Sequence, residues 1–323
     1  MPWKRLTKGI LHQMGGLAAL RLLRRDKFGV LVFHEFDEVY AASLEPICEH
    51  ITSHFEPVSL AKITAAIRGE ASLPPNAVTV TVDDGYRNFL TIGHPMFKKY
   101  RIPTTLYAVA SFADGRLWLW TDQVAFVLEA TTKKAISVEI EKGHVLDLDI
   151  SSATTRSASF FTLCEGLKMI PNQRRLEFLN DFALLCGVEV PPQPPPHRAS
   201  LSWEELRALA AEGVEIGCHT DSHPILSRLN DAADLIRETR GAKDLMEARL
   251  KRKVDHFCYP NGREIDISEA AVACVREAGF RSAVTCTYGL NTANADPLRV
   301  RRLPVGGITD FAYATETLVG IHC

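Results

Sequence analysis

Two adjacent carboxylates follow a strongly apolar segment of the chain. The segment VTVTVDDGYRN, residues 78–88, alternates β-branched residues and then places Asp83 and Asp84 directly before Gly85. Such a run is typical of a buried strand, and functional residues of parallel α/β folds gather at the carboxyl ends of their strands. The pair therefore indicates either a reactive site or a simple turn before a helix, because aspartate is also a good helix N-cap.

A histidine pair follows another apolar run. The segment VEIGCHTDSHPIL places His219 and His223 four residues apart. This spacing allows both imidazoles to reach one ion, and it favours a pair of metal ligands over two structural histidines. With one of the two aspartates, the set becomes His-His-Asp with an open position, which is the pattern of a catalytic metal site.

The two aspartates can then have different roles, one as a metal ligand and the other as a general base. One carboxylate binds the metal, and its neighbour accepts a proton from the bound water, whose pKa a divalent ion lowers to about 7. Without a cation, two adjacent carboxylates would repel each other. A third apolar run ends in Tyr259-Pro260-Asn261-Gly262. This loop is either a plain turn or the source of a backbone N–H for a developing oxyanion.

Short β-rich runs that alternate with helical patterns must position these loops. The alternation predicts a parallel α/β fold, either a barrel or a doubly wound sheet. The predicted strands are 29–33, 77–82, 104–110, 213–217, 255–259, 281–286 and 298–305, and the predicted helices are 43–54, 87–100, 202–212, 231–251 and 267–278. We expect the charged run 234–253, whose apolar residues recur at helical spacing, to form a solvated outer helix.

Residues at about 113–200 break this rhythm. Apolar residues alternate with period two on both sides of Lys142-Gly143, which predicts a hairpin. Two helical stretches, near 156–169 and 172–186, and a stiff proline-rich spacer follow. We interpret the segment as an insertion of a hairpin and helices into a domain that spans 29–323.

Composition excludes some classes of protein. The 323 residues are 46% hydrophobic and 24% charged, and the net charge of -2 gives no sign of a nucleic-acid-binding domain. Eight single cysteines without a CxxC pair fit a reducing compartment. The basic segment 1–28 is a poor signal-peptide core, so we expect a cytoplasmic protein. We predict that this segment is helical and that it either closes one end of the domain or contacts an anionic membrane surface.

The three loops together resemble a known family. TVDDGY, HTDSH and YPNG, in this order and each after a predicted strand, look like the motifs of the metal-dependent polysaccharide deacetylases, the NodB-homology domain. LVFHEF, LWLWTDQV and the whole stretch around LSWEELRALAAEG are also similar to that family. The resemblance covers roughly 29–125 and 200–305.

The resemblance implies a distorted (β/α) barrel of about seven strands that hydrolyses the acetamide of an N-acetylated sugar in a polysaccharide or glycan precursor. By motif position, Asp84, His219 and His223 would bind a divalent ion, with zinc expected. Asp83 would be the general base, and the backbone N–H around Asn261 would help to hold the oxyanion. Thr220, between the histidines, would brace its loop.

The sequence also departs from the family pattern. Members commonly carry an arginine where Cys258 stands, which helps to orient the base, and a tyrosine where Asn261 stands. Arg302 or a neighbour is a candidate to replace that arginine. The late Leu-x-His-Asp motif, which supplies a general acid in many members, is absent. His34, at the end of the first predicted strand, is the alternative candidate for the acid.

These departures leave other functions open. A catalytically reduced carbohydrate-binding or scaffold protein is the main alternative, although binding alone would not require both aspartates. A metal-dependent phosphoesterase would need further carboxylate or basic ligands, of which the sequence has no clear cluster. Trp118 and Trp120 could stack on a sugar ring or seat the insertion on the barrel, and we expect the second.

Overall fold

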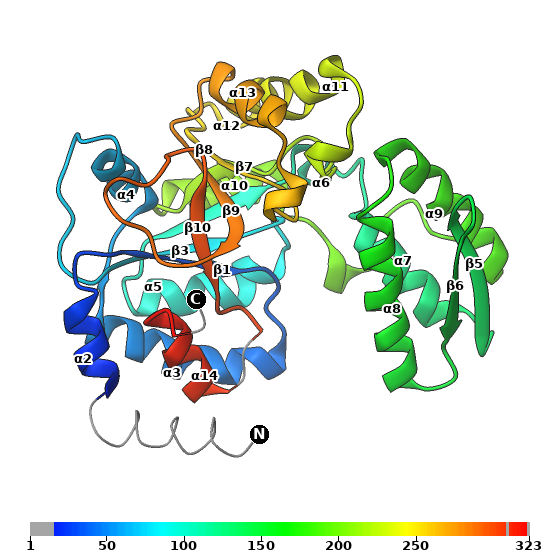
Figure 1. Ribbon diagram of the computed structural model, residues 1–323, viewed down its shortest axis with the longest axis horizontal. Helices are drawn as coiled ribbons and strands as arrows, with labels where there is room; N and C mark the ends of the chain where they lie inside the picture. The colour runs from blue at the N-terminus through cyan, green and yellow to red at the C-terminus, as the bar shows by residue number, and fades with distance from the viewer. Residues whose placement is uncertain (1–15, 308–309, 322–323) are drawn as a thin grey trace.

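Seven parallel strands form a closed ring in the computed structural model, which describes residues 16–307 and 310–321. The chain passes around the ring in sequence order, and the first strand pairs with both the last strand and the next one (Figure 1). The ring contains β1 (Gly29–Phe33), β3 (Ala77–Val82), β4 (Thr104–Ala108), β7 (Glu215–Cys218), β8 (His256–Cys258), β9 (Ser282–Tyr288) and β10 (Val300–Pro304). The short strand β2 (Glu56–Pro57) pairs with β3 outside the ring. This confirms the predicted (β/α) barrel.

Helices surround the ring because its strands are apolar on both faces. Every residue of β1, β3 and β4 is buried, so one face of each strand fills the barrel and the other packs against a helix. The covering helices are α3 (Glu38–His54), α4 (Leu60–Ile67), α5 (His94–Lys99), α10 (Trp203–Ala211), α11 (Ala232–Ile236), α12 (Ala242–Leu250), α13 (Glu269–Glu277) and α14 (Phe311–Leu318). A capping box formed by Ser202 and Glu205 begins α10.

The register of the parallel strands places the predicted site residues at one rim. Phe33 of β1 pairs with Val82 of β3, and Ala108 of β4 pairs with Cys218 of β7. Cys218 in turn pairs with Phe257 of β8. The residues that follow these strand ends therefore emerge on the same side of the barrel.

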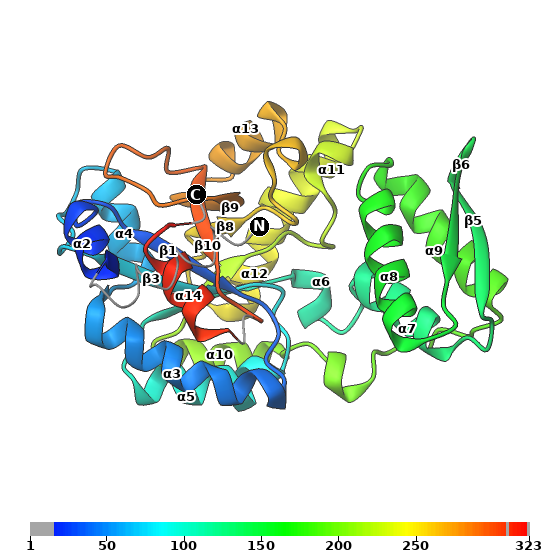
Figure 2. The same cartoon turned by 60° about the horizontal axis from the view of Figure 1, so that its bottom comes forward.

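The segment between β4 and β7 leaves the barrel at this rim. A short helix, α6 (Ala110–Ala113), is followed by α7 (Trp120–Ala130), the antiparallel hairpin β5 (Ala135–Glu141) and β6 (His144–Asp149), α8 (Ala153–Leu167) and α9 (Asn172–Cys186). These elements stand beside the barrel, with α7 and α8 on its side and the hairpin farther away (Figures 1 and 2).

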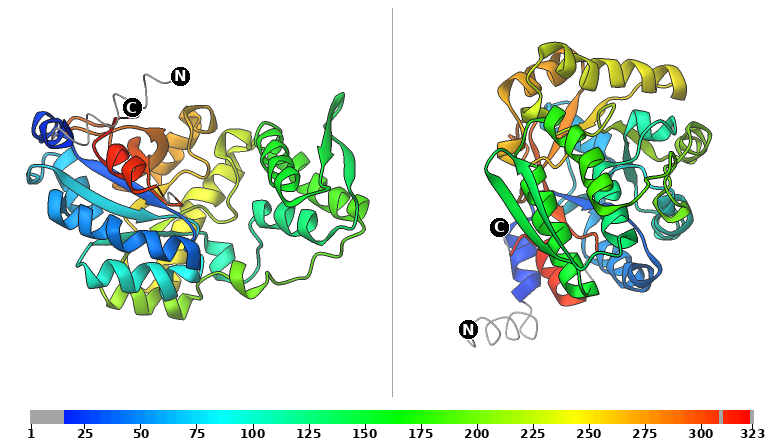
Figure 3. Two further views of the ribbon diagram at one scale, coloured as in Figure 1. Left: turned by 90° about the horizontal axis from the view of Figure 1, so that it is seen from below. Right: turned by 90° about the vertical axis from the view of Figure 1, so that its right-hand side faces the viewer.

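The insertion has a hydrophobic core of its own, separate from that of the barrel. The left view of Figure 3 shows that it extends the molecule to one side. Trp120 is buried in the core of the insertion, and Trp118 packs edge-on against Phe126 at a centroid distance of 5.4 Å. Both tryptophans thus contribute to the packing of the insertion.

Of the predicted basic segment 1–28, residues 1–15 lie outside the described part of the chain. The helix α2 (Gly16–Leu23) lies beside the end of the chain, where the guanidinium of Arg24 donates to the Val319 carbonyl. Leu17 is buried, whereas Leu22 and Leu23 are exposed. Within the described residues, every helix is too short or too polar to cross a bilayer.

Candidate active site

Asp84, His219 and His223 meet at the carboxyl rim of the barrel. Asp84 Oδ1 lies 3.4 Å from Nε2 of His219 and 3.4 Å from Nε2 of His223. Ligand atoms about 2.0–2.2 Å from one tetrahedral zinc ion are separated by roughly 3.3–3.6 Å. The three side chains therefore offer a donor set whose spacing and chemistry fit a divalent ion such as zinc.

The loops that carry these ligands contain unusual backbone conformations. Asp84, Thr220, His223 and Asn261 all have positive φ values, of 72°, 68°, 59° and 60°. A β-branched residue such as Thr220 is rarely found there, because its Cβ crowds the backbone. Four such residues at neighbouring strand ends store strain where ligand atoms must be aimed, which is characteristic of functional sites.

Hydrogen bonds orient the histidine loop. His219 Nδ1 lies 2.8 Å from the Cys258 carbonyl, which leaves its Nε2 free to face Asp84. A metal ligand is commonly oriented through its second ring nitrogen in this way. The Thr220 hydroxyl accepts from the backbone N–H of His223 at 2.9 Å, so Thr220 braces the loop.

Burial and hydrogen bonding act differently on the two histidines. Burial would lower the pKa of His219, but its contacts with Asp84 and Asp83 outweigh burial and raise the pKa. Burial dominates at His223 and lowers its pKa. Burial alone would raise the pKa of Asp84, yet hydrogen bonds from both histidines hold it well below the ordinary value. Asp84 thus remains an ionised acceptor.

The carboxylate of Glu238 accepts hydrogen bonds from the loop that carries His219 and His223. Its Oε2 accepts from the backbone N–H groups of Asp221 and Ser222 at 3.0 and 2.8 Å, and its Oε1 accepts from the Ser222 hydroxyl at 2.6 Å. Glu238 is buried, in the π-helical turn between α11 and α12. The expectation that the charged run 234–253 is a solvated outer helix is therefore wrong at Glu238, because this turn of the helix faces the loop and supplies its acceptor.

Asp83 is clamped by Arg302 from β10. The guanidinium donates Nη1 to Oδ1 and Nη2 to Oδ2, both at 2.7 Å, and donates Nε to the Thr285 carbonyl at 2.7 Å. Burial would raise the pKa of Asp83, but the charge and hydrogen bonds of Arg302 outweigh burial and lower it. Arg302 thus occupies the place that the sequence left open beside Cys258, whose Sγ is 3.3 Å from Nη2.

A second possible donor set is less suitable for a cation. Asp83, His219 and Cys258 also place ligand atoms close together. However, the positive charge of Arg302 already occupies both oxygens of Asp83, and burial raises the pKa of the Cys258 thiol well above its ordinary value. A neutral thiol beside a bound guanidinium is a poor metal ligand, because the thiolate is the form that binds.

The two aspartates face one cavity of about 380 Å³ that the histidines also line. His34 follows β1 on the same rim; its Nε2 lies 3.7 Å from Asp83 Oδ2, and half of its side chain is exposed. Asn261 lines the cavity too, and its side-chain amide is held by Asp266. No hydrogen bond among the described residues uses the backbone N–H of Asn261.

Asp122 is a cavity residue that sequence reasoning missed. It lies in the first turn of α7, where it accepts from the hydroxyl of Tyr86 at 2.9 Å. Burial raises the pKa of Asp122 to about 7, although the hydrogen bond from Tyr86 opposes the shift. The only available signal was its place in LWLWTDQV, one of the segments that resemble the family.

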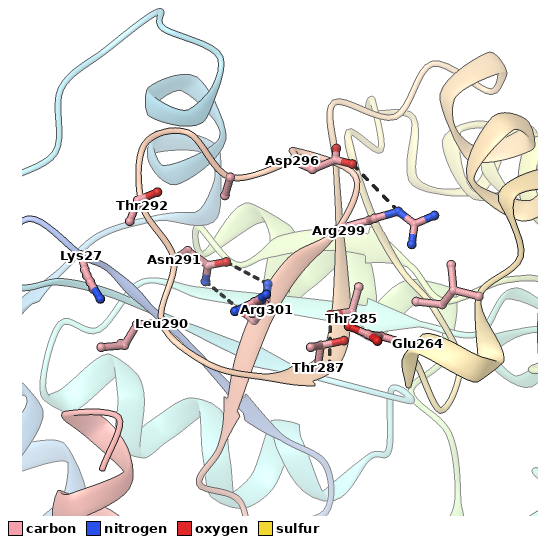
Figure 4. A pocket seen from close by; sticks show the side chains of 12 residues that line it. Lys27, Glu264, Thr285, Thr287, Leu290, Asn291, Thr292, Asp296, Arg299 and Arg301 are labelled. Atoms are coloured by element: carbon pink, nitrogen blue, oxygen red, sulfur yellow. Dashed lines mark hydrogen bonds and ion pairs between the residues drawn. The ribbon is translucent and has the colours of Figure 1, made fainter. Parts of the chain in front are cut away.

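A larger cavity, of about 450 Å³, lies elsewhere on the molecule. It is on the outer side of β9 and β10, where the described loop 289–299 connects the strands without a helix (Figure 4). Its polar lining includes Asn291, whose side chain bonds the backbone of Arg301. This cavity contains none of the predicted site residues, so the smaller rim cavity is the candidate reaction centre.

The fold and the site together define a class of protein, a (β/α) barrel whose strand-end loops gather two aspartates and two histidines at one rim. A family model described as polysaccharide deacetylase matches residues 70–283. The chain belongs to this family.

Solved structures share the fold. The Streptococcus pyogenes deacetylase PplD in complex with acetate is 14% identical, with a TM-score of 0.58 over 91% of this chain and 96% of that chain. The BpsB deacetylase domain from Bordetella bronchiseptica is 17% identical, with a TM-score of 0.55 over 87% of this chain and 96% of that chain. IcaB from Ammonifex degensii is 15% identical, with a TM-score of 0.55 over 91% and 97% of the two chains.

A curated relative is similar over a shorter stretch. The poly-beta-1,6-N-acetyl-D-glucosamine N-deacetylase of Escherichia coli K12 is 40% identical over 60 residues. The match spans 19% of this chain and 9% of that protein.

Proposed function

We propose that this polysaccharide deacetylase family member is a metal-dependent hydrolase that removes the acetyl group from an N-acetylated sugar of a polysaccharide or glycan precursor. One observation carries the proposal. The oxygen of Asp84 and the Nε2 atoms of two histidines converge within 3.4 Å, directly beside a second aspartate that a buried arginine holds ionised. The name of the curated relative gives an N-acetylated sugar polymer as its substrate, and the solved structures are named as deacetylases.

Asp84, His219 and His223 would hold the ion. When bound, a divalent ion polarises a carbonyl and lowers the pKa of water to about 7. Asp83 then accepts a proton from the attacking water, because its negative charge is maintained by Arg302 and directed into the cavity. The unengaged backbone N–H of Asn261 donates to the oxygen that becomes negative during the attack.

The leaving amine requires a proton. His34 is placed to supply it, since it lines the same cavity, lies 3.7 Å from Asp83 and keeps contact with solvent. The balanced reaction consumes one water and the acetamide and yields acetate and a free amino sugar.

Arg302 bears on the alternative of a catalytically reduced binding protein. That alternative rested on Cys258, which stands where members commonly have an arginine. Because Arg302 reaches Asp83 from β10 with two hydrogen bonds of 2.7 Å, the orienting cation is supplied from another strand. This favours catalysis over binding alone.

Acetate release tests the proposal. The zinc-loaded protein is incubated with N-acetylglucosamine oligomers of β-1,4 and β-1,6 linkage, and acetate is measured together with bound metal. Asp83→Asn serves as the matched control, which should retain the ion and lose turnover. A protein that binds the ion in stoichiometric amount and releases no acetate from any N-acetylated glycan would contradict the proposed activity.

We further propose a cytoplasmic reaction with contact between the basic segment 1–28 and an anionic membrane surface. Eight single cysteines, of which the described ones are free thiols, support a reducing compartment. The exposed Leu22 and Leu23 of α2 support surface contact. Cell fractionation with and without residues 1–27 tests this idea, and an unchanged distribution would remove its basis.

A further inference from the structure

The insertion forms one wall of the reaction cavity. Besides the barrel residues, the cavity is lined by Trp120, Thr121 and Asp122 around the start of α7 and by Phe160 and Lys168 of α8. Phe160 packs against the core of the insertion on one side and faces the cavity on the other. An aromatic ring held in this way is a rigid apolar surface, as required to stack against a sugar ring.

Polar contacts with the barrel hold α8 in this position. Glu165 binds Arg263 of the loop after β8 at 2.9 Å, and it also binds Lys168 at 2.6 Å. Arg228, in the loop after β7, donates to the Lys168 carbonyl at 3.1 Å. The end of α8 therefore contacts two of the loops that follow the strands of the site.

The wall is longer than one sugar. Phe160 and Lys168 are eight positions apart, which corresponds to about 12 Å along the helix axis. Both line the same cavity as Asp83 and Asp84. A wall of this length offers contact to a neighbouring ring of a chain whose reacting acetamide lies at the aspartates.

We propose that α8 of the insertion carries a sugar subsite next to the reactive one, with Phe160 as the stacking surface and Lys168 as a hydrogen-bond donor to hydroxyl groups. The inference rests on the proposed deacetylase function and specifies its substrate as a chain of at least two linked sugars. The insertion thereby determines chain-length preference, while the barrel performs the reaction.

The chain supplies a matched pair of variants. Phe161 follows Phe160 on α8 but points outward, with 64% of its surface exposed, and does not line the cavity. Phe160→Leu keeps an apolar side chain in the core of the insertion and removes only the ring. Phe161→Leu makes the same chemical change outside the cavity. Near-ultraviolet circular dichroism confirms that both variants are folded.

The measurement is the ratio of kcat/KM for the N-acetylglucosamine trimer to that for the monomer. We expect a ratio of about ten or more in the wild-type protein, a loss of most of this preference in Phe160→Leu, and an unchanged ratio in Phe161→Leu. A wild-type ratio near one would overturn the inference, as would a ratio that Phe160→Leu leaves intact.

A measurement of sugar binding tests the subsite independently of the proposed deacetylase activity. If no acetate is released from any oligomer, the proposed function fails, and calorimetric titration with the monomer and the trimer decides the inference alone. Tighter binding of the trimer that is lost in Phe160→Leu and kept in Phe161→Leu supports the subsite. Equal affinities for the two sugars, or no binding of the trimer, would reject it.

Discussion

Replacement of Arg302 by methionine tests the buried ion pair on which the proposed base depends. The side chains of Arg302 and Asp83 are 0% and 2% exposed, and methionine fills a similar space without a charge. The change removes two hydrogen bonds of 2.7 Å to Asp83 and one to the Thr285 carbonyl. It leaves the carboxylate of Asp83 buried without the guanidinium that pairs with it.

The expected magnitude is large. Removal of one partner of a buried ion pair costs about 3–5 kcal/mol, against a total stability of about 5–15 kcal/mol for a typical domain. Activity should fall as well, because Asp83 loses both its orientation and the cation that keeps it ionised. The contribution of a general base is about 10²–10⁴ in rate, and we expect kcat to fall by at least the lower figure.

Urea unfolding and acetate release measure the two effects. Arg301→Met is the matched control, because the neighbouring Arg301 is exposed, lines the outer cavity and makes its described hydrogen bonds through its backbone. We expect it to change stability by less than about 0.5 kcal/mol. In the double variant with Asp83→Asn, part of the lost stability should return, since no buried charge remains unpaired.

A small effect would refute the reasoning. If Arg302→Met loses less than about 1 kcal/mol and retains wild-type turnover, the pair neither stabilises the fold nor prepares the base. A double variant whose losses simply add would show that the two side chains are not coupled.

Three further predictions concern the other parts of the site. His223→Ala should lose both bound zinc and turnover. His94→Ala, in which the lost ring pairs with Glu212 away from the site, should keep both. Zinc is measured after dialysis, and full zinc content in His223→Ala would contradict its assignment as a ligand. His34→Ala should lower kcat by about 10²-fold or more with the metal content unchanged, so full turnover would exclude it as the acid. Glu238→Ala should weaken zinc binding by about 10–100-fold, because the backbone N–H groups of Asp221 and Ser222 lose their acceptor. An unchanged zinc affinity would show that the histidine loop keeps its shape without the carboxylate of Glu238.

Local sequence patterns predicted most of the barrel. Continuous apolar runs of strand length are visible in the sequence because both faces of each strand are covered, and the seven strands of the barrel lie where those runs predicted them. The two-residue strand β2 and the helices α4, α6, α7 and α14 were missed. The helix α7 begins within the tryptophan-rich segment, where the packing of the insertion core rather than a cap signal determines the helix start.

The sequence by itself determined the features that are local in the chain. These are two adjacent aspartates after one strand and two histidines four residues apart after another. The order of these motifs also indicated the family. Only the tertiary structure decided which distant side chains complete the site. Arg302 reaches Asp83 from β10, Glu238 supports the histidine loop from a surface helix, and Phe160 approaches from the insertion. The physical reason is that closure of a parallel barrel brings strand ends together in space irrespective of their separation in the chain, and no local pattern records that proximity.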